Sequence, residues 1–148
     1  GVYTFFQRTS PYPMLMTFDA PDSNECCVQR STSNTPLQAL TLWNDPVFFE
    51  AAQGLARRIA TLPTHEAESR LADRDRIRVA MRICLTREAE ASEIEALQAL
   101  RAWAEGQALV RSAAGSRAER GENRAAPAEA WLHVARVLLN LDEFITRE

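Results

Sequence analysis

The chain has 148 residues, a formal net charge of −3 and 25% charged residues, values that are ordinary for a single globular domain. The acidic balance gives little support to a role in binding nucleic acid, so we expect no nucleic-acid partner. The apolar runs fall well short of the ~20 residues that a membrane-spanning helix requires, so we expect no membrane span.

The beginning of the sequence has the character of an excerpt from a longer protein. Residues 1–8 open without Met, and they lack the basic start and the long apolar stretch of a signal peptide. We therefore expect any targeting signal to lie upstream of this sequence.

Residues 1–34 have the pattern of an irregular or extended lead-in. Apolar residues at 2–6 favour a short strand or an extended segment, and Pro11 and Pro13 interrupt regular structure. The apolar run at 14–18 is one that a loop would not normally leave in water. We therefore expect the lead-in to pack on the helices that follow.

Three cysteines, Cys26, Cys27 and Cys84, form neither a C-x-x-C nor a C-x-x-C-H motif. The sequence therefore predicts no zinc or other metal site and no attachment of c-type haem in this chain. The adjacent pair Cys26–Cys27 could form a strained vicinal disulfide. The alternative is that one of the two is buried as a small hydrophobe.

A helical pattern begins after the lead-in. Thr35 as an N-cap, followed by Pro and then by Gln38 in the capping-box position, predicts a helix that runs to about residue 43. Asp45, again followed by Pro, predicts a second helix that ends near residue 61. One face of this helix carries apolar residues at spacings of three and four, namely Phe48, Ala51, Ala52, Leu55 and Ile59.

Residues 66–85 predict a third helix. Its expected inner stripe is Leu71, Ile77, Ala80, Met81 and Cys84. Ser92 as an N-cap, with Glu95 closing a capping box, predicts a fourth helix. The residues expected on its inner face are Ile94, Leu97, Leu100 and Ala104.

The stretch 112–126 is rich in Ala, Gly, Ser, Arg and Glu and has no apolar face, so we expect a flexible loop there. Pro127 opens the last predicted helix, with Trp131, Ala135, Leu138 and Leu141 on its buried side. Four to five helices after the lead-in predict an all-α fold, with a helical domain over 35–148.

No motif in the sequence carries recognisable chemistry. The five glycines form no phosphate-binding loop, and there is no nucleophile elbow. The two histidines, His65 and His133, have no second ligand at helical spacing. We therefore predict no catalytic residue, and whether the chain serves an enzyme stays open.

The lead-in and the first helices concentrate polar residues that make contacts of fixed geometry. They are Arg8, Asp19, Arg30, Asn34, Asn44 and Asp45. One interpretation is structural: Asn34 and Asp45 cap helices, while an arginine pairs with Asp19 to hold the loop. The other is a polar binding site for a ligand or a neighbouring domain, built on an ordered loop.

Several motifs in this region together resemble one known family. They are Tyr3-Thr4-Phe5, Arg8-Thr9-Ser10-Pro11, Met14, Phe18-Asp19-Ala20-Pro21, Cys26, Arg30, the run from Asn34 to Leu40, and Asn44-Asp45-Pro46. They resemble a domain of unknown function found at the C-terminal end of planctomycete proteins that carry a planctomycete-type cytochrome c domain. Trp131 and residues 138–144 look like the final helix and exit of that domain.

The resemblance implies that the chain is the latter part of that domain within a large exported protein, periplasmic or at the cell surface. Haem c would be attached upstream in the parent protein, and the partners would be upstream domains of the same polypeptide. It implies no established activity. Our first hypothesis is a non-catalytic packing domain, and the second is a share in a redox or polysaccharide-related active site completed by upstream residues.

We also expect the isolated chain to self-associate, because its lead-in has too little regular structure to bury its own apolar side chains. The side chains in question are Tyr3, Phe5, Phe6, Met14, Leu15, Met16 and Phe18.

Overall fold

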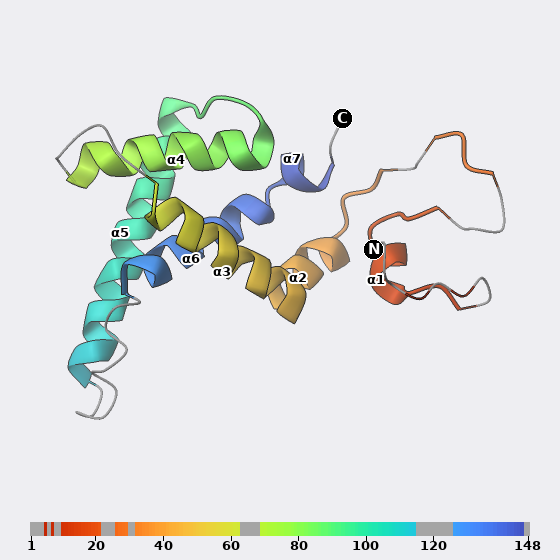
Figure 1. The fold of residues 1–148 in the computed structure, drawn as a ribbon, viewed down its shortest axis with the longest axis horizontal. Coiled ribbons are helices and arrows are strands. Elements are labelled where there is room, and N and C mark those ends of the chain that lie inside the picture. The colour runs from red at the N-terminus through yellow and green to blue at the C-terminus, as the bar shows by residue number, and fades with distance from the viewer. Residues whose placement is uncertain are drawn as a thin grey trace.

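The architecture is known from a computed structural model that describes residues 5, 7, 10–21, 26–29, 32–62, 69–114 and 126–146. Seven helices are present in these ranges, five of them long, and there is no strand among the described residues. The prediction of an all-α fold is therefore confirmed. Figure 1 shows the longer helices gathered into a bundle, with the lead-in at one end.

The lead-in contains a short helix, α1 (Pro13–Thr17), which begins with Pro in its first turn. Among the described residues upstream of it, Gln7 and Ser10 form an isolated antiparallel bridge. The short strand or extended segment predicted at 2–6 lies, apart from Phe5, outside the described residues. Figure 1 places α1 beyond the end of α2, on the side away from α4 and α5.

The lead-in packs on the bundle only in part. The rings of Phe18 and Phe48 lie 5.6 Å apart, so the residue after α1 contacts the third helix. Phe5, in contrast, is 83% exposed, and Met16 is also exposed. Tyr3 and Phe6 lie outside the described residues.

Helices α2 (Pro36–Asn44) and α3 (Pro46–Ala60) begin where the cap residues predicted. The Thr35 hydroxyl accepts from the Gln38 N–H, and the Gln38 side chain accepts from the Thr35 N–H, which completes the capping box. The Asp45 carboxylate accepts from the Val47 N–H at 2.8 Å. Both caps satisfy backbone donors that the first turn of a helix leaves without intrahelical partners.

The core forms between α3, α4 (Ser69–Leu85), α5 (Ala91–Ala114) and α6 (Ala126–Leu139). Helix α6 is central, because it packs against both α3 and α5. The largest fully buried apolar side chains of this core are Trp131, Ile59, Ile77, Met81, Leu138 and Val134. Burying one large apolar side chain stabilises a fold by roughly 1.5–3 kcal/mol, so this cluster holds the four helices together.

The predicted inner stripes were largely correct where the side chains are described, with one error on α3. The side chain of Leu71, predicted on the stripe of α4, lies outside the described part of the structure. Ala51 is exposed, and Ala56 is buried in its place. The buried positions of α3 are Ala52, Ala56 and Ile59, a spacing of four and three. Ala51 lies one residue before this stripe and therefore on its solvent side.

The predicted start of the fourth helix was also wrong. Helix α5 begins at Ala91, so Ser92 lies inside its first turn and does not cap it. The Glu90 N–H donates instead to the Glu93 carboxylate at 2.8 Å, and Ile94 N–H bonds the Glu90 carbonyl. The acidic side chain that closes the first turn is thus Glu93, two residues before the Glu95 that we had predicted.

Both ends of the loop expected at 112–126 are helical, because α5 continues to Ala114 and α6 begins at Ala126. Residues 115–125 lie outside the described ranges. After α6, a final short helix, α7 (Asp142–Ile145), packs against α4 and α6. Among the described helices, none is both long and apolar enough to cross a membrane.

Candidate functional site

Asp19 is the residue on which the predicted polar cluster depends most. It follows α1 with a φ of 54°, a left-handed conformation that Asp tolerates better than most residues. Its Oδ2 atom accepts from the Ser33 N–H at 2.8 Å and from the Ser33 hydroxyl at 2.7 Å. The carboxylate therefore ties the end of α1 to the segment that leads into α2.

Gln38 joins the same network from the first turn of α2, and it is almost completely buried. Its Nε2 group donates to the Thr17 carbonyl at 2.9 Å, to the Ser33 hydroxyl at 3.1 Å and to Asp19 Oδ2 at 3.3 Å. Its Oε1 atom accepts the Thr35 N–H of the capping box. The amide is therefore fully used in joining the lead-in to α2.

The remaining predicted residues do not converge on this network. Asn44 Nδ2 donates to the Leu40 carbonyl at 3.0 Å within α2, and Asp45 caps α3. Asn34 Nδ2 donates to the Asp142 carboxylate in α7, so it caps no helix, contrary to our prediction. The N-cap of α2 is the next residue, Thr35, because only its hydroxyl is placed to accept from the third N–H of the helix.

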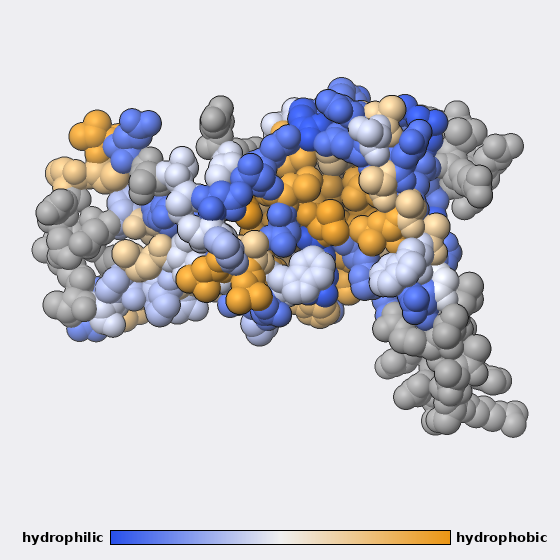
Figure 2. Space-filling model, turned by 180° about the vertical axis from the view of Figure 1, so that it is seen from behind, coloured by the Kyte–Doolittle hydropathy of each residue, from blue (hydrophilic) through white to orange (hydrophobic). Residues whose placement is uncertain are grey.

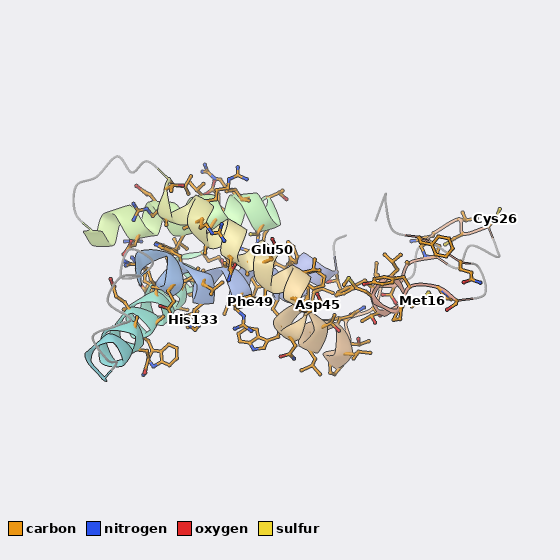
Figure 3. All side chains as sticks on the ribbon, turned by 60° about the horizontal axis from the view of Figure 1, so that its bottom comes forward. Met16, Cys26, Asp45, Phe49, Glu50 and His133 are labelled. Carbon is orange, nitrogen blue, oxygen red and sulfur yellow. The ribbon has the colours of Figure 1, made fainter. Side chains whose placement is uncertain are left out.

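Arg8 and Arg30, the two cations of the predicted cluster, lie outside the described residues, as does His65. Cys26 and Cys27 are both exposed free thiols, so the expectation that one of them is buried was wrong; the buried cysteine is Cys84 in α4. Burial raises the pKa of the Cys84 thiol. Figure 3 shows Cys26 in the lead-in, far from the bundle.

The sequence reasoning missed a second polar cluster, built around Arg87 in the connector between α4 and α5. Its guanidinium contacts the Glu93 carboxylate at 2.6 and 2.9 Å and the Glu143 carboxylate at 2.7 and 3.1 Å. The hydrogen bonds from Arg87, together with the N–H of Glu90, lower the pKa of Glu93 to about 2. The two carboxylates in turn raise the pKa of Arg87. This cluster clamps α7 to the start of α5.

A third cluster, also missed, lies where α4, α5 and α6 meet. Asp73 of α4 forms a hydrogen-bonded ion pair with Arg101 of α5, and Arg76 lies 3.6 Å from the other carboxylate oxygen. The Arg101 guanidinium also lies over the Trp131 ring of α6, 5.2 Å from its centre. Burial raises the pKa of Asp73, although both arginines oppose the shift.

A signal for this third cluster is present in the sequence. Asp73 falls on the α4 stripe, four residues before Ile77, and Arg101 falls on the α5 stripe, between Leu97 and Ala104. Residues on one stripe share a helix face, so two opposite charges on core-facing stripes predict a buried ion pair.

In all three clusters the polar groups hold one segment of the chain to another. Among the described residues, no group of three His, Cys, Asp or Glu side chains is arranged to hold a metal ion. The absence of a metal or haem site in this chain nonetheless stays a prediction. The geometry supports anchoring of the lead-in, of α7 and of the α4–α5 contact.

Comparison with known proteins identifies a family for most of the chain. Neither the curated proteins nor the solved structures contain a significant match. Residues 1–101 match the family described as "Protein of unknown function (DUF1553)", and the match includes the lead-in, α2, α3 and α4. Residues 131–146, which we also found similar to the family, lie outside the matched region. Because 101 of the 148 residues match, the chain belongs to this family of proteins of unknown function.

Proposed function

We propose that the chain is a non-catalytic helical domain that packs against other domains of a larger exported protein. The observation that carries this proposal is the use of Asp19, Gln38 and Asn34 in contacts within the chain. A binding site needs polar groups that converge on a ligand and are not already hydrogen-bonded to other groups of the protein. The described members of the predicted cluster bond backbone groups or side chains of other residues in the chain.

The surface of α2 supports a packing role. Its inner side carries Gln38 and Leu42, which are buried, whereas Leu37 and Leu40 lie on the other side and are each more than half exposed. Isolated exposed apolar residues are normal, but neighbouring ones on a helix face mark a contact surface. A second domain that covered this face would remove both leucines from water.

The nature of the parent protein is a further part of the proposal, and it rests on the family resemblance. The resemblance to domains that accompany planctomycete-type cytochrome c domains favours a periplasmic or cell-surface location. The haem c would then be bound by an upstream domain, which would be a packing partner of this chain. In this arrangement the chain holds the upstream domains in place, and any reaction takes place in those domains.

Cross-linking of the whole parent polypeptide, followed by mass spectrometry, tests the packing role. The chain contains no Lys, so the reagent must join carboxylates, of which the side chains of 20 Asp and Glu residues provide many. Because α2 has no carboxylate, we expect cross-links to upstream domains from Asp45, between α2 and α3, and from Glu50 of α3. Hydrogen exchange in α2 and α3 should be slower in the parent protein than in the isolated chain. Equal exchange in both forms, with no interdomain cross-link, would show that the chain is an independent module.

A second measurement separates packing from a share in an active site. Asp19→Asn keeps the shape of the side chain but removes its charge, so in a packing domain it should reduce stability only. If the parent protein lost its activity while the melting temperature stayed unchanged, Asp19 would belong to an active site.

A further inference from the structure

Exposed aromatic rings and basic side chains from four helices form a continuous strip on one face of the bundle. We call it the aromatic strip, and its members are Trp43 of α2, Phe49 of α3, His133 and Arg136 of α6, and Trp103 of α5. The Arg136 guanidinium lies 3.9 Å from the centre of the Trp43 ring and 5.5 Å from that of Phe49. One turn away on α6, the His133 ring meets the Trp103 ring edge-on at 6.0 Å.

The strip is open to solvent along its length. Trp103 is 56% exposed, Trp43 40% and Phe49 38%. Leu40, one turn before Trp43 on the same face of α2, extends the strip and is also exposed. Figure 3 shows Phe49 and His133 on the same side of the bundle. Figure 2 shows the back of the molecule, where white and blue side chains lie beside an apolar area of the helical part.

Arg136 gives the strip an uncompensated positive charge. It is half-buried, and its Nη2 atom donates to the Trp43 carbonyl at 2.7 Å. Its Nε and Nη1 donors have no hydrogen-bond partner in the described part of the chain, nor does any described carboxylate lie within ion-pairing distance of it. The neighbouring rings fix the position of the guanidinium but do not neutralise it.

We infer that the aromatic strip is a docking surface for a protein segment that presents a carboxylate next to an apolar side chain. The inference rests on the proposed packing function and names the chemistry of the partner. A carboxylate is the group that the free donors of an arginine bind best, and the flanking rings keep water from the contact. Trp and Arg are the residue types that most often dominate the energy of protein interfaces.

Selection of short random peptides displayed on phage, with the immobilised chain as the target, tests this inference. We expect the enriched peptides to combine Asp or Glu with aromatic or aliphatic residues. Arg136→Gln should weaken binding of the best peptide about tenfold or more, as loss of a central interface arginine typically does. The matched control is Arg58→Gln, which removes an exposed arginine of α3 outside the strip and should leave affinity unchanged.

Because Arg136 also bonds the Trp43 carbonyl, its replacement could disturb the fold, and a second variant avoids this problem. Leu40→Ser changes only an exposed side chain, and it should weaken peptide binding several-fold while the circular dichroism spectrum stays unchanged. Enriched peptides without acidic residues, no enrichment, or equal binding to all variants would overturn the inference. So would a dimer of the chain that Leu40→Ser dissociates, or binding of polysaccharides alone to the strip.

The two proposals can fail separately. If cross-links join the chain to upstream domains through another face, while Trp43 and Trp103 stay open to oxidative footprinting in the parent protein, the packing function stands and the docking surface is wrong. If the peptides bind as expected but no interdomain cross-link forms, the surface is real and its partner lies in another protein.

Discussion

Replacement of Arg101 by Met should destabilise the chain strongly, because it would strand the Asp73 carboxylate in the interior. The Asp73 side chain is 6% exposed and that of Arg101 is 15% exposed. After the change, the nearest cation to Asp73 would be Arg76, 3.6 Å away. Loss of one partner of a buried ion pair costs about 3–5 kcal/mol, and the contact with Arg76 places this case at about 3 kcal/mol.

Replacement of the other partner, Asp73, should lower the free energy of unfolding by less than replacement of Arg101. In Asp73→Leu, Arg101 would keep its contact with Glu105 at 3.6 Å and its position over the Trp131 ring. We expect a loss of about 2 kcal/mol. The double variant Asp73→Leu with Arg101→Met removes both charges. Its loss of stability should be smaller than the sum of the two single losses, since apolar residues often replace a buried pair without penalty.

Urea denaturation of the single and double variants at neutral pH measures these differences. Arg82→Met is the matched control, because it breaks the exposed ion pair with Glu88 and should change the free energy of unfolding by less than about 0.5 kcal/mol. Additive losses in the double variant would refute the reasoning, since uncoupled residues do not form a pair.

The pH dependence gives a second check on the same pair. Burial already raises the pKa of Asp73 above its unfolded value, and removal of Arg101 would raise it further. A raised carboxyl pKa means that the folded state takes up the proton more readily than the unfolded state. Stability attributable to Asp73 is therefore greatest at low pH and is lost as pH rises through the folded pKa. Arg101→Met should accordingly gain stability on mild acidification, and a flat profile would contradict this.

Three further predictions concern other contacts of the chain. The pKa of Glu93, lowered to about 2, should contribute stability that is present above pH ~4.5 and is lost as pH falls towards 2. At about one-third exposure this loss is about 1 kcal/mol in acid titration of unfolding, and Glu93→Gln should abolish it, whereas Glu95→Gln should not. Asp45→Ala should cost about 1 kcal/mol in urea denaturation and Asp45→Asn much less, because Asn also caps helices. Gln38→Leu should cost about 2–3 kcal/mol, because it leaves the Thr35 N–H and the Thr17 carbonyl without their partner; a near-neutral result would show that water replaces the amide.

Helix starts that depend on adjacent residues could be read from the sequence. Thr35 and Asp45 cap the helices as predicted, because a cap and the N–H groups that it satisfies lie within three residues. The start of α5 was misplaced because three acidic residues, Glu90, Glu93 and Glu95, lie in one short stretch with Ser92. The structure uses Glu93 because Arg87 holds its carboxylate in place, a contact that no local rule contains.

Contacts between distant segments could not be predicted in this way. The hydrogen bond from Asn34 to Asp142 joins residues 108 positions apart, and no periodicity relates them. Asn34 precedes a helix, so the local sequence predicted a helix cap. In the folded chain α7 lies close enough for Asn34 to bond Asp142. The Asp73–Arg101 pair is a different case, because both charges lie on otherwise apolar helix stripes. A charged residue at such a position needs a partner, so the pair could have been predicted from the sequence.

The contacts of helix α7 show that polar side chains connect separate segments of the chain. Two adjacent residues of α7 hold different parts of the molecule: Asp142 accepts from Asn34 of the lead-in, and Glu143 pairs with Arg87 of the α4–α5 connector. In the described part of the lead-in, Phe18 contacts Phe48 of α3, and hydrogen bonds from Asn34, Ser33 and Gln38 add polar contacts that hold the lead-in against the helices. A domain held in this way can keep the lead-in in a fixed position relative to the bundle while the aromatic strip stays open for a partner.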